Sequence, residues 1–414
     1  MPATNHADWP PTREEGLRRL ADFLPRAGWD YAERRNFDLG PGDRSNVSTL
    51  SPYLRHRLLT EDEVVSATLL SQGLKASEKF VGETCWRTYW KGWLELRPSV
   101  WDRYQAEVLG LLDTLDRDAG LRDRYESACS GRSGIGCVDL WARELVESGY
   151  LHNHARMWFA SIWIFTLRLP WALGADFFLR HLIDGDPASN TLSWRWVAGL
   201  QTKGKTYLAT ASNIARFTEG RVVPREPLAS RAEPIEGEPL PAWEPLPRAR
   251  EIDATRPFAL VLTEDDLAVE SIDLVGSVPV AVAGVLATED RSPRGVNPIV
   301  LRFADGAMSD ALDRASRRFG CPAIRLEGDR PEELNDWCDS GKVDQLVTPF
   351  APVGPARSRL DRLESVLVRS GRTLIRPRGA WDEALWPHAT SGYFGFKKKL
   401  DVSLARLGIT DRSS

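Results

Sequence analysis

Two short segments of this 414-residue chain bring together charged, amide and indole side chains in a way that could serve a buried cofactor. Residues 152–157 read His-Asn-His-Ala-Arg-Met, and residues 182–196 read Leu-Ile-Asp-Gly-Asp-Pro-Ala-Ser-Asn-Thr-Leu-Ser-Trp-Arg-Trp. Arg156 and Asp184 could form a buried pair in which each member needs the other, because an unpaired ion in an apolar site is costly. A purely structural ion pair between two helices is the alternative, and spacing leaves both open.

A hydroxyl-rich turn lies upstream of both segments. Residues 48–52 read Ser-Thr-Leu-Ser-Pro and come directly before a helical pattern. Side-chain hydroxyls and the free backbone N–H groups of a helix start can bind an anion such as a phosphate. The alternative is an ordinary helix cap.

One face of a predicted helix also carries groups that could do chemistry. Glu83, Trp86, Arg87 and Trp90 stand at positions i, i+3, i+4 and i+7, which share a helix face. The alternative is an amphipathic helix with its indoles in the core and a solvated Glu83–Arg87 salt bridge.

Together these segments resemble the FAD-binding domain of the photolyase/cryptochrome family, over about residues 30–220. Residues 47–52 are similar to the family's Thr-Ser-x-Leu-Ser-Pro segment, with Val47 in place of the usual threonine. Residues 83–90 match Glu-x-x-Trp-Arg-x-x-Tyr, with Trp90 in place of the tyrosine. The resemblance implies FAD as the cofactor.

The resemblance also implies which residues contact FAD. On the diphosphate side these are Tyr31, Val47, Ser48, Thr49, Leu50 and Ser51, and around the isoalloxazine ring they are Glu83, Arg87, Asn153, Arg156, Asp184, Asp186 and Asn190. Asn190 matches a position near the flavin N5 that is Asp in many plant cryptochromes. An amide there favours a neutral or reduced flavin, as in photolyases.

By the same resemblance, the substrate is DNA that contains cyclobutane pyrimidine dimers, repaired under blue light by an electron from excited reduced FAD. Glu83 would hydrogen-bond the flipped dimer, Trp86 and Trp196 would stack on it, and Asn153 and Met157 occupy the positions typical of dimer-repair enzymes. The histidine pair of the (6-4) photolyases is not matched by His152 and His154.

Trp194 and Trp171 match the first two members of the family's electron-transfer chain. The third member is not identified from the sequence, and Tyr125, Trp90 and Trp93 are candidates. For a tryptophan outside the matched motifs, packing in the core is the expected role.

Two functions follow as hypotheses. A photolyase-like lyase is favoured by the dimer-contact residues. A cryptochrome-type photoreceptor without repair, acting through a protein partner, is favoured by the altered loop at residues 201–208 and by the largely missing helical segment after it.

The surrounding pattern predicts the elements that must position these residues. Residues 1–220 are predicted to form an all-α domain of the photolyase FAD-binding type, with helical spacing in 64–70, 80–96, 108–115, 140–146 and 157–167. A proline-rich linker is expected at 221–255. Residues 256–414 are predicted to form an α/β, Rossmann-like domain with strands at 258–262, 278–285, 299–301, 323–326, 345–347 and 373–375, and helices at 309–319, 331–338 and 357–369.

The order of the two domains is unusual for the family that the chain resembles. Photolyases place their α/β antenna domain before the helical domain, so a circular permutation is indicated, which a flexible linker and neighbouring termini permit. The FAD half carries sharper motifs than the antenna-like half. The resemblance therefore does not extend to a second chromophore bound in the antenna-like half. Residues 386–399 end in a basic aromatic stretch that could touch nucleic acid or pack on the helical domain.

Composition sets broad limits. The formal net charge of −4 argues against a uniformly basic, nucleic-acid-coating surface, although a local basic patch is compatible with it. Five cysteines without Cys-x-x-Cys spacing suggest neither a disulfide framework nor a metal site. The longest apolar run, 157–167, is too short to span a bilayer, and residues 1–8 show no secretory pattern, so a cytoplasmic protein without membrane contact is expected.

Overall fold

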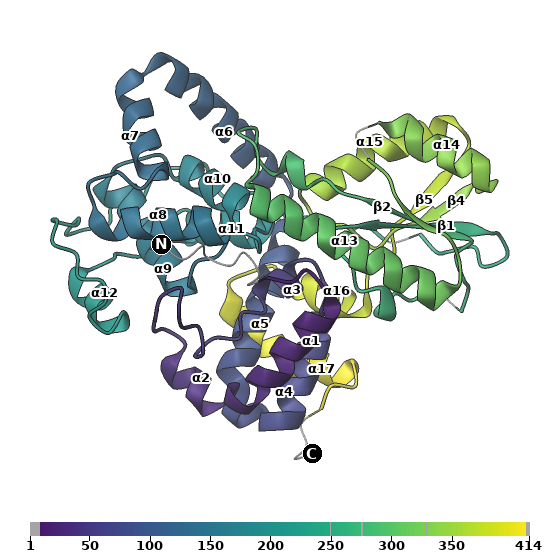
Figure 1. The fold of residues 1–414 in the computed structure, drawn as a ribbon, viewed down its shortest axis with the longest axis horizontal. Helices are drawn as coiled ribbons and strands as arrows, with labels where there is room; N and C mark the ends of the chain where they lie inside the picture. The colour runs from purple at the N-terminus through teal and green to yellow at the C-terminus, as the bar shows by residue number, and fades with distance from the viewer. Residues whose placement is uncertain (1–8, 249, 275, 328–329, 411–414) are drawn as a thin grey trace.

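The computed structural model describes residues 9–248, 250–274, 276–327 and 330–410 (Figure 1). The outermost residues of the two predicted domains, 1–8 and 411–414, lie outside this range. The first part of the chain is helical. It contains α1 (Arg13–Phe23), the short turn η1 (Leu24–Arg26), α2 (Trp29–Arg34), α3 (Ser51–Arg55), α4 (Glu61–Gln72), α5 (Leu74–Glu95), α6 (Ser99–Arg117), α7 (Ala119–Cys129), α8 (Gly136–Ser148), α9 (Asn153–Ser161), the π-helical turn η2 (Ile162–Thr166), α10 (Trp171–His181), α11 (Pro187–Val197) and α12 (Ala211–Phe217).

The second part contains a parallel sheet with helices. Its elements are β1 (Phe258–Thr263), η3 (Val269–Ser271), β2 (Ala281–Val285), η4 (Thr288–Arg291), α13 (Pro298–Phe319), β3 (Ala323–Arg325), α14 (Pro331–Gly341), β4 (Gln345–Val347), α15 (Pro355–Arg369) and β5 (Thr373–Ile375). The strand order is β3-β2-β1-β4-β5, and all pairs are parallel. Every residue of β1 is buried, as expected for a central parallel strand covered on both faces. A helical part followed by a parallel α/β sheet is thus what the sequence predicted.

The strand predicted at 299–301 was wrong. These residues form the first turn of α13, which begins at Pro298 and runs into the helix predicted from 309. Asn297 caps this helix by accepting a hydrogen bond from the N–H of Ile299 at 2.9 Å, and proline is favourable in the first turn. Cap and proline outweigh the strand preference of three apolar residues.

Residues 221–255 have no helix or strand at any position that the structure describes, and they run along the helical part. The N–H of Ile235 donates to the carbonyl of Ala198 at 3.0 Å, and that of Glu244 donates to the carbonyl of Leu96 at 2.8 Å. Leu228, Ile235 and Leu246 pack against the helical core. This connection therefore contacts the helical part at several points between residues 228 and 246.

The chain returns to the helical part after the sheet, through α16 (Ala380–Leu385), η5 (Trp386–His388) and α17 (Tyr393–Arg406). In Figure 1 the yellow helices α16 and α17 lie beside α5. The indole of Trp381 donates to the hydroxyl of Thr88 at 2.9 Å, and the hydroxyl of Tyr89 donates to the carbonyl of Ser391 at 2.8 Å. Residues 380–406 therefore pack on the helices, which is the alternative that the sequence left open for residues 386–399.

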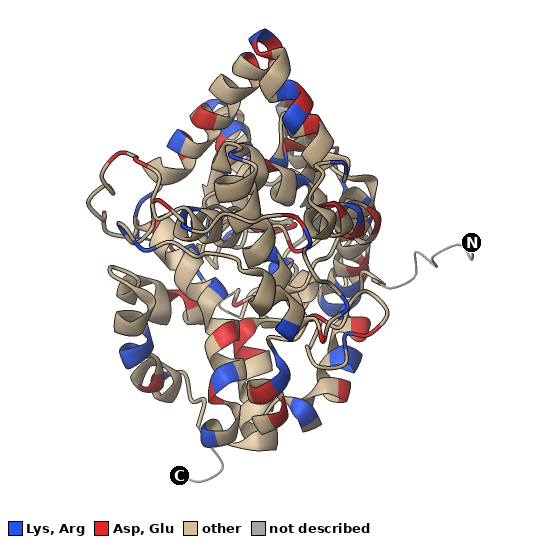
Figure 2. Cartoon of the chain, turned by 90° about the vertical axis from the view of Figure 1, so that its left-hand side faces the viewer, with Lys and Arg blue, Asp and Glu red and all other residues tan. Residues whose placement is uncertain are grey.

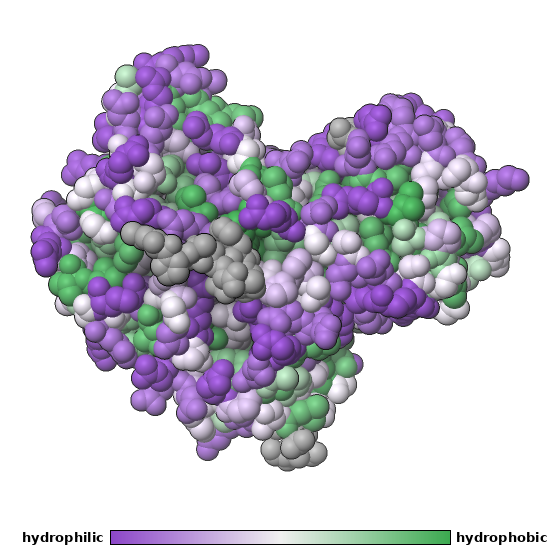
Figure 3. Space-filling view, in the orientation of Figure 1, coloured by the Kyte–Doolittle hydropathy of each residue, from purple (hydrophilic) through white to green (hydrophobic). Residues whose placement is uncertain are grey.

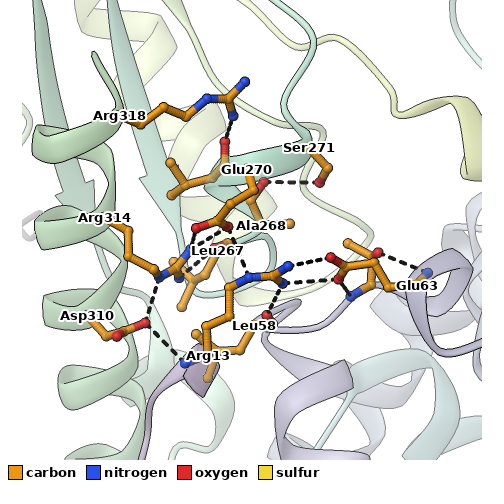
Figure 4. A network of polar contacts seen from close by, with 12 residues as sticks. Arg13, Leu58, Glu63, Leu267, Ala268, Glu270, Ser271, Asp310, Arg314 and Arg318 are labelled. Carbon is orange, nitrogen blue, oxygen red and sulfur yellow. Dashed lines mark hydrogen bonds and ion pairs between the residues drawn. The ribbon is translucent and has the colours of Figure 1, made fainter. Parts of the chain in front are cut away.

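An ionic network joins the first helices to the sheet part (Figure 4). Arg13 of α1 donates to the carbonyl of Leu58 at 2.8 Å, pairs with Glu63 of α4, and lies 3.5 Å from a carboxylate oxygen of Glu270 in η3. Glu270 in turn pairs with Arg314 of α13 at 2.7 Å. One core cluster also contains residues of both parts, so the two parts share buried surface.

The surface is mixed in character. Lysine and arginine alternate with aspartate and glutamate along the helices in Figure 2. Hydrophilic side chains cover most of the face in Figure 3, which is hollowed between the α6–α7 arm and the α14–α15 edge. Within the described residues, no helix has the length and apolar character that a bilayer span needs.

Candidate cofactor site

The long helix α5 carries the first group of predicted site residues. Glu83 forms an ion pair with Arg35, which follows α2, and its side chain is 33% exposed. Arg87 lies one turn later and turns inward, with Nη1 3.8 Å from Oδ2 of Asp186. The Glu83–Arg87 salt bridge considered from the sequence does not appear among the ion pairs of the described residues.

Asp186 is the centre of a buried charge cluster. It caps α11 by accepting a hydrogen bond from the N–H of Ser189 at 2.7 Å. Three cations surround its Oδ2: Arg87, Nε of Arg55 at 3.9 Å and Nζ of Lys91 at 4.0 Å. Burial would raise the pKa of Asp186, but Lys91, Arg87 and Arg55 outweigh burial and lower that pKa to about 2. Asp186 is therefore ionised at every physiological pH.

Arg156 and Asp184 form the pair considered from the sequence. Nη2 of Arg156 lies 3.0 Å from Oδ2 of Asp184, and Nε of Arg156 donates to the carbonyl of Leu151 at 2.8 Å. Burial would raise the pKa of Asp184, but Arg156 and Arg87 together lower it. The pair thus joins the start of α9 to the loop before α11.

The hydroxyl-rich turn lies at the start of α3. The N–H of Leu50 donates to the hydroxyl of Ser48 at 3.4 Å, and the Thr49 hydroxyl accepts from Nη1 of Arg19 at 2.9 Å. Ser51 is the first residue of α3, whereas Leu50 is buried in the core. Val47 is half-buried beside the turn. The hydroxyls therefore lie at a helix start, which is a favourable place for an anion.

Tyr31 of α2 packs edge-on against Phe23 at 5.9 Å and Phe80 at 5.1 Å between ring centroids. Burial is the main cause that raises the pKa of its phenol above the ordinary value, with a smaller contribution from Glu83. Its phenol is therefore a neutral donor, as a contact to phosphate oxygen requires.

The remaining predicted contacts come from α9 and α11. Asn153 is exposed at the first position of α9, and Met157 is half-buried one turn later. Asn190 is buried, and its Nδ2 donates to the carbonyl of Ala175 at 2.8 Å, which leaves its Oδ1 as the acceptor. Trp196 is half-buried, with its ring 6.0 Å from that of Tyr207.

Trp194 and Trp171 are both buried, 2% and 3% exposed, and have different aromatic neighbours. Trp194 lies 6.3 Å from Trp163, which in turn lies 6.0 Å from Tyr125. Trp171 lies 5.8 Å from Tyr104. Among the candidates for a third relay member, Tyr125 is therefore placed behind Trp194, through Trp163.

One contact was not anticipated. The ring of Tyr393 in α17 lies flat on that of Trp86, with centroids 3.7 Å apart and planes at 9°. The Tyr393 hydroxyl donates to the carbonyl of Gly82 at 2.7 Å. One face of the indole predicted to stack on substrate is covered by the chain itself.

Sequence reasoning also missed Lys91 and Arg55. Lys91 is 1% exposed and follows Arg87 by one helical turn, so the face that carried Glu83 and Arg87 could have been extended to it. Arg55, 2% exposed, follows the hydroxyl turn and is the first of three consecutive basic or imidazole residues, 55–57. Tyr393 lies in the aromatic stretch at 386–399, but no local pattern placed its ring on Trp86.

These residues fit a cofactor with a polar ring edge and a diphosphate. Within the described residues, four buried polar atoms of the cluster have no hydrogen-bond partner: Oδ1 of Asp184, Nη1 of Arg87, Nζ of Lys91 and Oγ of Ser189. Buried polar groups normally have partners, so donors and acceptors remain here for a bound molecule. Asp184 accepts, Ser189 can accept or donate, and Arg87 and Lys91 donate.

Comparisons with known proteins agree with this chemistry. Residues 80–219 match the family model of the FAD binding domain of DNA photolyase. A deoxyribodipyrimidine photo-lyase of Neurospora crassa is 30% identical over 211 residues, which are 50% of this chain and 33% of that protein. One of Streptomyces griseus is 35% identical over 190 residues, which are 46% of this chain and 39% of that protein.

Solved structures give a partial overlap. The crystal structure of a bacterial class III photolyase from Agrobacterium tumefaciens covers 51% of this chain and 44% of that chain, with 27% identity and a TM-score of 0.43. This chain spans less than half the length of each of these three proteins. FAD, the cofactor expected from the sequence, is the ligand of the matched domain type.

Proposed function

Because the helical part of this chain belongs to the photolyase/cryptochrome family, we propose that the protein is a blue-light-driven, FAD-dependent lyase that splits cyclobutane pyrimidine dimers in DNA. The observation that carries the proposal is the arrangement on α5. Glu83 and Trp86, the two groups suited to a flipped dimer, share a helix with Arg87, which faces the buried Asp186 cluster.

The proposed roles follow from chemistry and position. Arg35 holds the Glu83 carboxylate, which can accept hydrogen bonds from pyrimidine N–H groups. The Asp186 cluster and the Arg156–Asp184 pair hold the polar edge of the cofactor in a dry site. FAD held there would supply light-driven electron donation to the dimer, with return of the electron after the ring splits, so no net redox change would result.

A repair assay tests this proposal. The purified protein with photoreduced FAD is mixed with DNA that contains a defined thymine dimer, and recovery of thymine absorbance is followed under blue light and in darkness. We expect light-dependent recovery that Glu83→Ala abolishes. Glu78→Ala is the matched control, because Glu78 lies on the same helix but pairs with Lys397 at the surface. Equal activity of both variants would refute the assigned role of Glu83.

A photoreceptor without repair activity is the second candidate, and the Tyr393–Trp86 stack favours it. A covered indole cannot stack on substrate through that face, and α17 is then a structured surface for a protein partner. Bound, photoreducible FAD with no dimer repair in either single-stranded or duplex DNA would select this function.

For the α/β part, we propose a permuted, antenna-like domain without a second chromophore. In sheets of this order, ligands bind beyond the carboxyl ends of the strands at the switch point, here between β1 and β4. The residues just after β1 are engaged by the end of α3 and the turn that follows it: Arg55 pairs with Asp265, and Arg57 with Asp266 at 3.0 Å. Unfolding the purified protein should release FAD alone, and an additional chromophore in equal amount would contradict the proposal.

The tail helix α17 could add to DNA contact. Phe394 is 81% exposed next to Tyr393, and Lys398 and Lys399 are exposed on the same helix. An exposed ring beside cations suits a nucleic acid strand. Changing both lysines to alanine should lower DNA affinity. The logarithm of the binding constant should also fall less steeply with the logarithm of the salt concentration, by the equivalent of about two phosphate contacts.

A further inference from the structure

A second kind of chemistry is indicated by a cavity between the helical part and the α/β part. The cavity has a volume of about 320 Å³, and its walls include Trp101 and Tyr104 of α6, Asp176 of α10, and Glu289 and Arg291 of η4. Tyr104 is 3% exposed and Asp176 is 0% exposed. A far smaller space is enough for a water molecule. The cavity therefore has room for water beside buried polar side chains.

A phenol and a carboxylate at this cavity lack partners. Across the part of the chain that the structure describes, the Tyr104 hydroxyl and both carboxylate oxygens of Asp176 have no hydrogen-bond partner. Nε of Arg180 lies 3.7 Å from Oδ2 of Asp176, and Ser292 approaches the carboxylate without forming a hydrogen bond. Buried polar groups normally have partners. A phenol and a carboxylate that line one cavity can satisfy each other directly or through one water.

The charges around this pair favour a neutral phenol beside a basic carboxylate. Burial raises the pKa of Asp176 above its ordinary value, although the charges of Arg180 and Arg294 oppose this. Burial also raises the pKa of the Tyr104 phenol, with smaller contributions from the acidic groups around it, Asp176, Glu107 and Tyr125. Among these groups, Asp176 has the largest effect on Tyr104.

The phenol lies at the end of a short path of aromatic rings. The ring of Tyr104 is 5.8 Å from that of Trp171. The ring of Trp194 lies against α10 one turn after Trp171, because a Cβ atom at Gly174 would be only 2.4 Å from Cη2 of Trp194. The path therefore joins the cavity to the interior of the helical part.

Oxidation of a phenol requires a base. When a tyrosine loses an electron, its hydroxyl becomes strongly acidic and releases its proton. In a buried site the acceptor must lie within hydrogen-bond reach or one water away. A cation radical that kept its proton would be an uncompensated charge in an apolar environment, which is costly. Tyr104 is thus a usable electron donor only if a neighbouring group takes up the proton.

We propose that Tyr104 and Asp176 form a proton-coupled electron donor at the end of the path through Trp171. An electron passes from Tyr104 to oxidised Trp171, and the phenolic proton passes to the Asp176 carboxylate. Trp171 is thereby reduced, Tyr104 becomes a neutral radical, and Asp176 becomes a neutral carboxylic acid. The inference rests on the proposed function, which supplies the oxidant as Trp171 that has lost an electron to light-excited flavin. It does not rest on dimer repair.

The first measurement uses the unaltered, FAD-loaded protein. After a blue-light flash, transient absorption follows the tryptophan and tyrosine radicals, and infrared difference spectroscopy follows carboxyl groups. We expect a neutral tyrosyl radical to appear together with the band of a newly protonated carboxylic acid. The yield of the radical should fall in acid, because Asp176 that is already protonated cannot accept a second proton. A parent protein without a tyrosyl radical, or with the radical but without the carboxyl band, overturns the proposal.

The second measurement uses matched variants. Asp176→Asn keeps the size of the side chain but removes the base, so the tyrosyl radical should form about a hundredfold more slowly and the carboxyl band should be absent. Tyr104→Phe should lack both signals. Glu289→Gln is the control, because this exposed carboxylate lines the same cavity, and it should keep both.

Two outcomes among the variants contradict the assignment. A tyrosyl radical that forms at the parental rate in Asp176→Asn excludes Asp176 as the acceptor. Loss of the carboxyl band in Glu107→Gln instead would assign the proton to Glu107, which is exposed and lies near Trp171 and Arg195. Repair of dimer DNA by chemically reduced protein is assayed separately. Because that reaction needs no electron path, its failure would refute the lyase and leave the radical measurements valid.

Discussion

Tyr393 lies flat on Trp86, although the two residues are 307 positions apart in the chain and the sheet part is inserted between them. The stack is reinforced by the hydrogen bond from the Tyr393 hydroxyl to the carbonyl of Gly82 at 2.7 Å. A dimer that stacked on this face of Trp86 would first have to displace Tyr393. The tail helix therefore belongs to the candidate site.

Removing this ring should expose Trp86. A stacked pair and one hydrogen bond are each worth about 1 kcal/mol, so Tyr393→Ala should tighten binding of dimer-containing DNA about tenfold if the dimer uses this face. Tyr393→Phe keeps the stack and serves as the control. Fluorescence anisotropy of labelled dimer DNA measures the change, and unchanged affinity would place the dimer elsewhere.

Breaking the pair between α9 and the α11 loop should be costly. Asp184→Asn leaves Arg156 partly buried without its carboxylate, and we expect a loss of about 2 kcal/mol in the free energy of unfolding, together with weaker FAD retention. Urea unfolding and flavin content per protein report the two effects. The double variant Arg156→Met with Asp184→Asn should lose less stability than the sum of the losses in the two single variants.

Lys91 should matter more at neutral pH than in acid. The pKa of Asp186, about 2 when folded, lies below its ordinary value, so its contribution is present above about pH 4 and is lost as pH falls toward 2. Lys91→Met raises this folded pKa. Stability at pH 7 should then fall by about 1 kcal/mol, and the difference from the parent should shrink as pH falls toward 2, measured by urea unfolding across this range. Lys79→Met, an exposed change on α5, should shift nothing.

Glu144 should produce the opposite pH dependence. Its pKa is raised when folded, to about 7, so the folded state binds its proton more tightly and stability falls as pH rises from about 4.5 to 7. Glu144→Gln cannot ionise. We expect it to match the parent below pH 4.5 and to exceed it above pH 7 by at most about 3 kcal/mol, measured by urea unfolding across this range. If the stability of Glu144→Gln and that of the parent changed in parallel with pH, the prediction would be contradicted.

The aromatic neighbours of Trp171 and Trp194 predict the route of electrons to the cofactor. Tyr104 lies 5.8 Å from Trp171, whereas Tyr125 lies behind Trp163. If the outward route runs through Trp171, Tyr104→Phe should slow light-driven reduction of bound flavin about tenfold, because phenylalanine is harder to oxidise. Tyr125→Phe should leave the rate nearly unchanged. If flavin reduction were slow in Tyr125→Phe and normal in Tyr104→Phe, the route would run through Trp163.

Short-range spacing accounts for what the sequence could predict about the site. Glu83, Trp86 and Arg87 share a helix face because the α-helix repeats every 3.6 residues, and the helix start after residues 48–50 follows from its hydroxyls and proline. The parallel sheet was likewise readable from short apolar runs between amphipathic helices. The strand expected at 299–301 failed because a cap and a proline outweighed its apolar pattern.

By itself, then, the sequence determined the helical and α/β parts and the motifs within single elements, where periodicity and capping act over a few residues. The tertiary structure decided that Tyr393 covers Trp86, that Arg55, Arg87 and Lys91 converge on Asp186, and that arginines of α1 face the turn at 47–49. Those contacts join distant segments. They depend on how buried faces and charges of whole elements pack together, which no local pattern encodes.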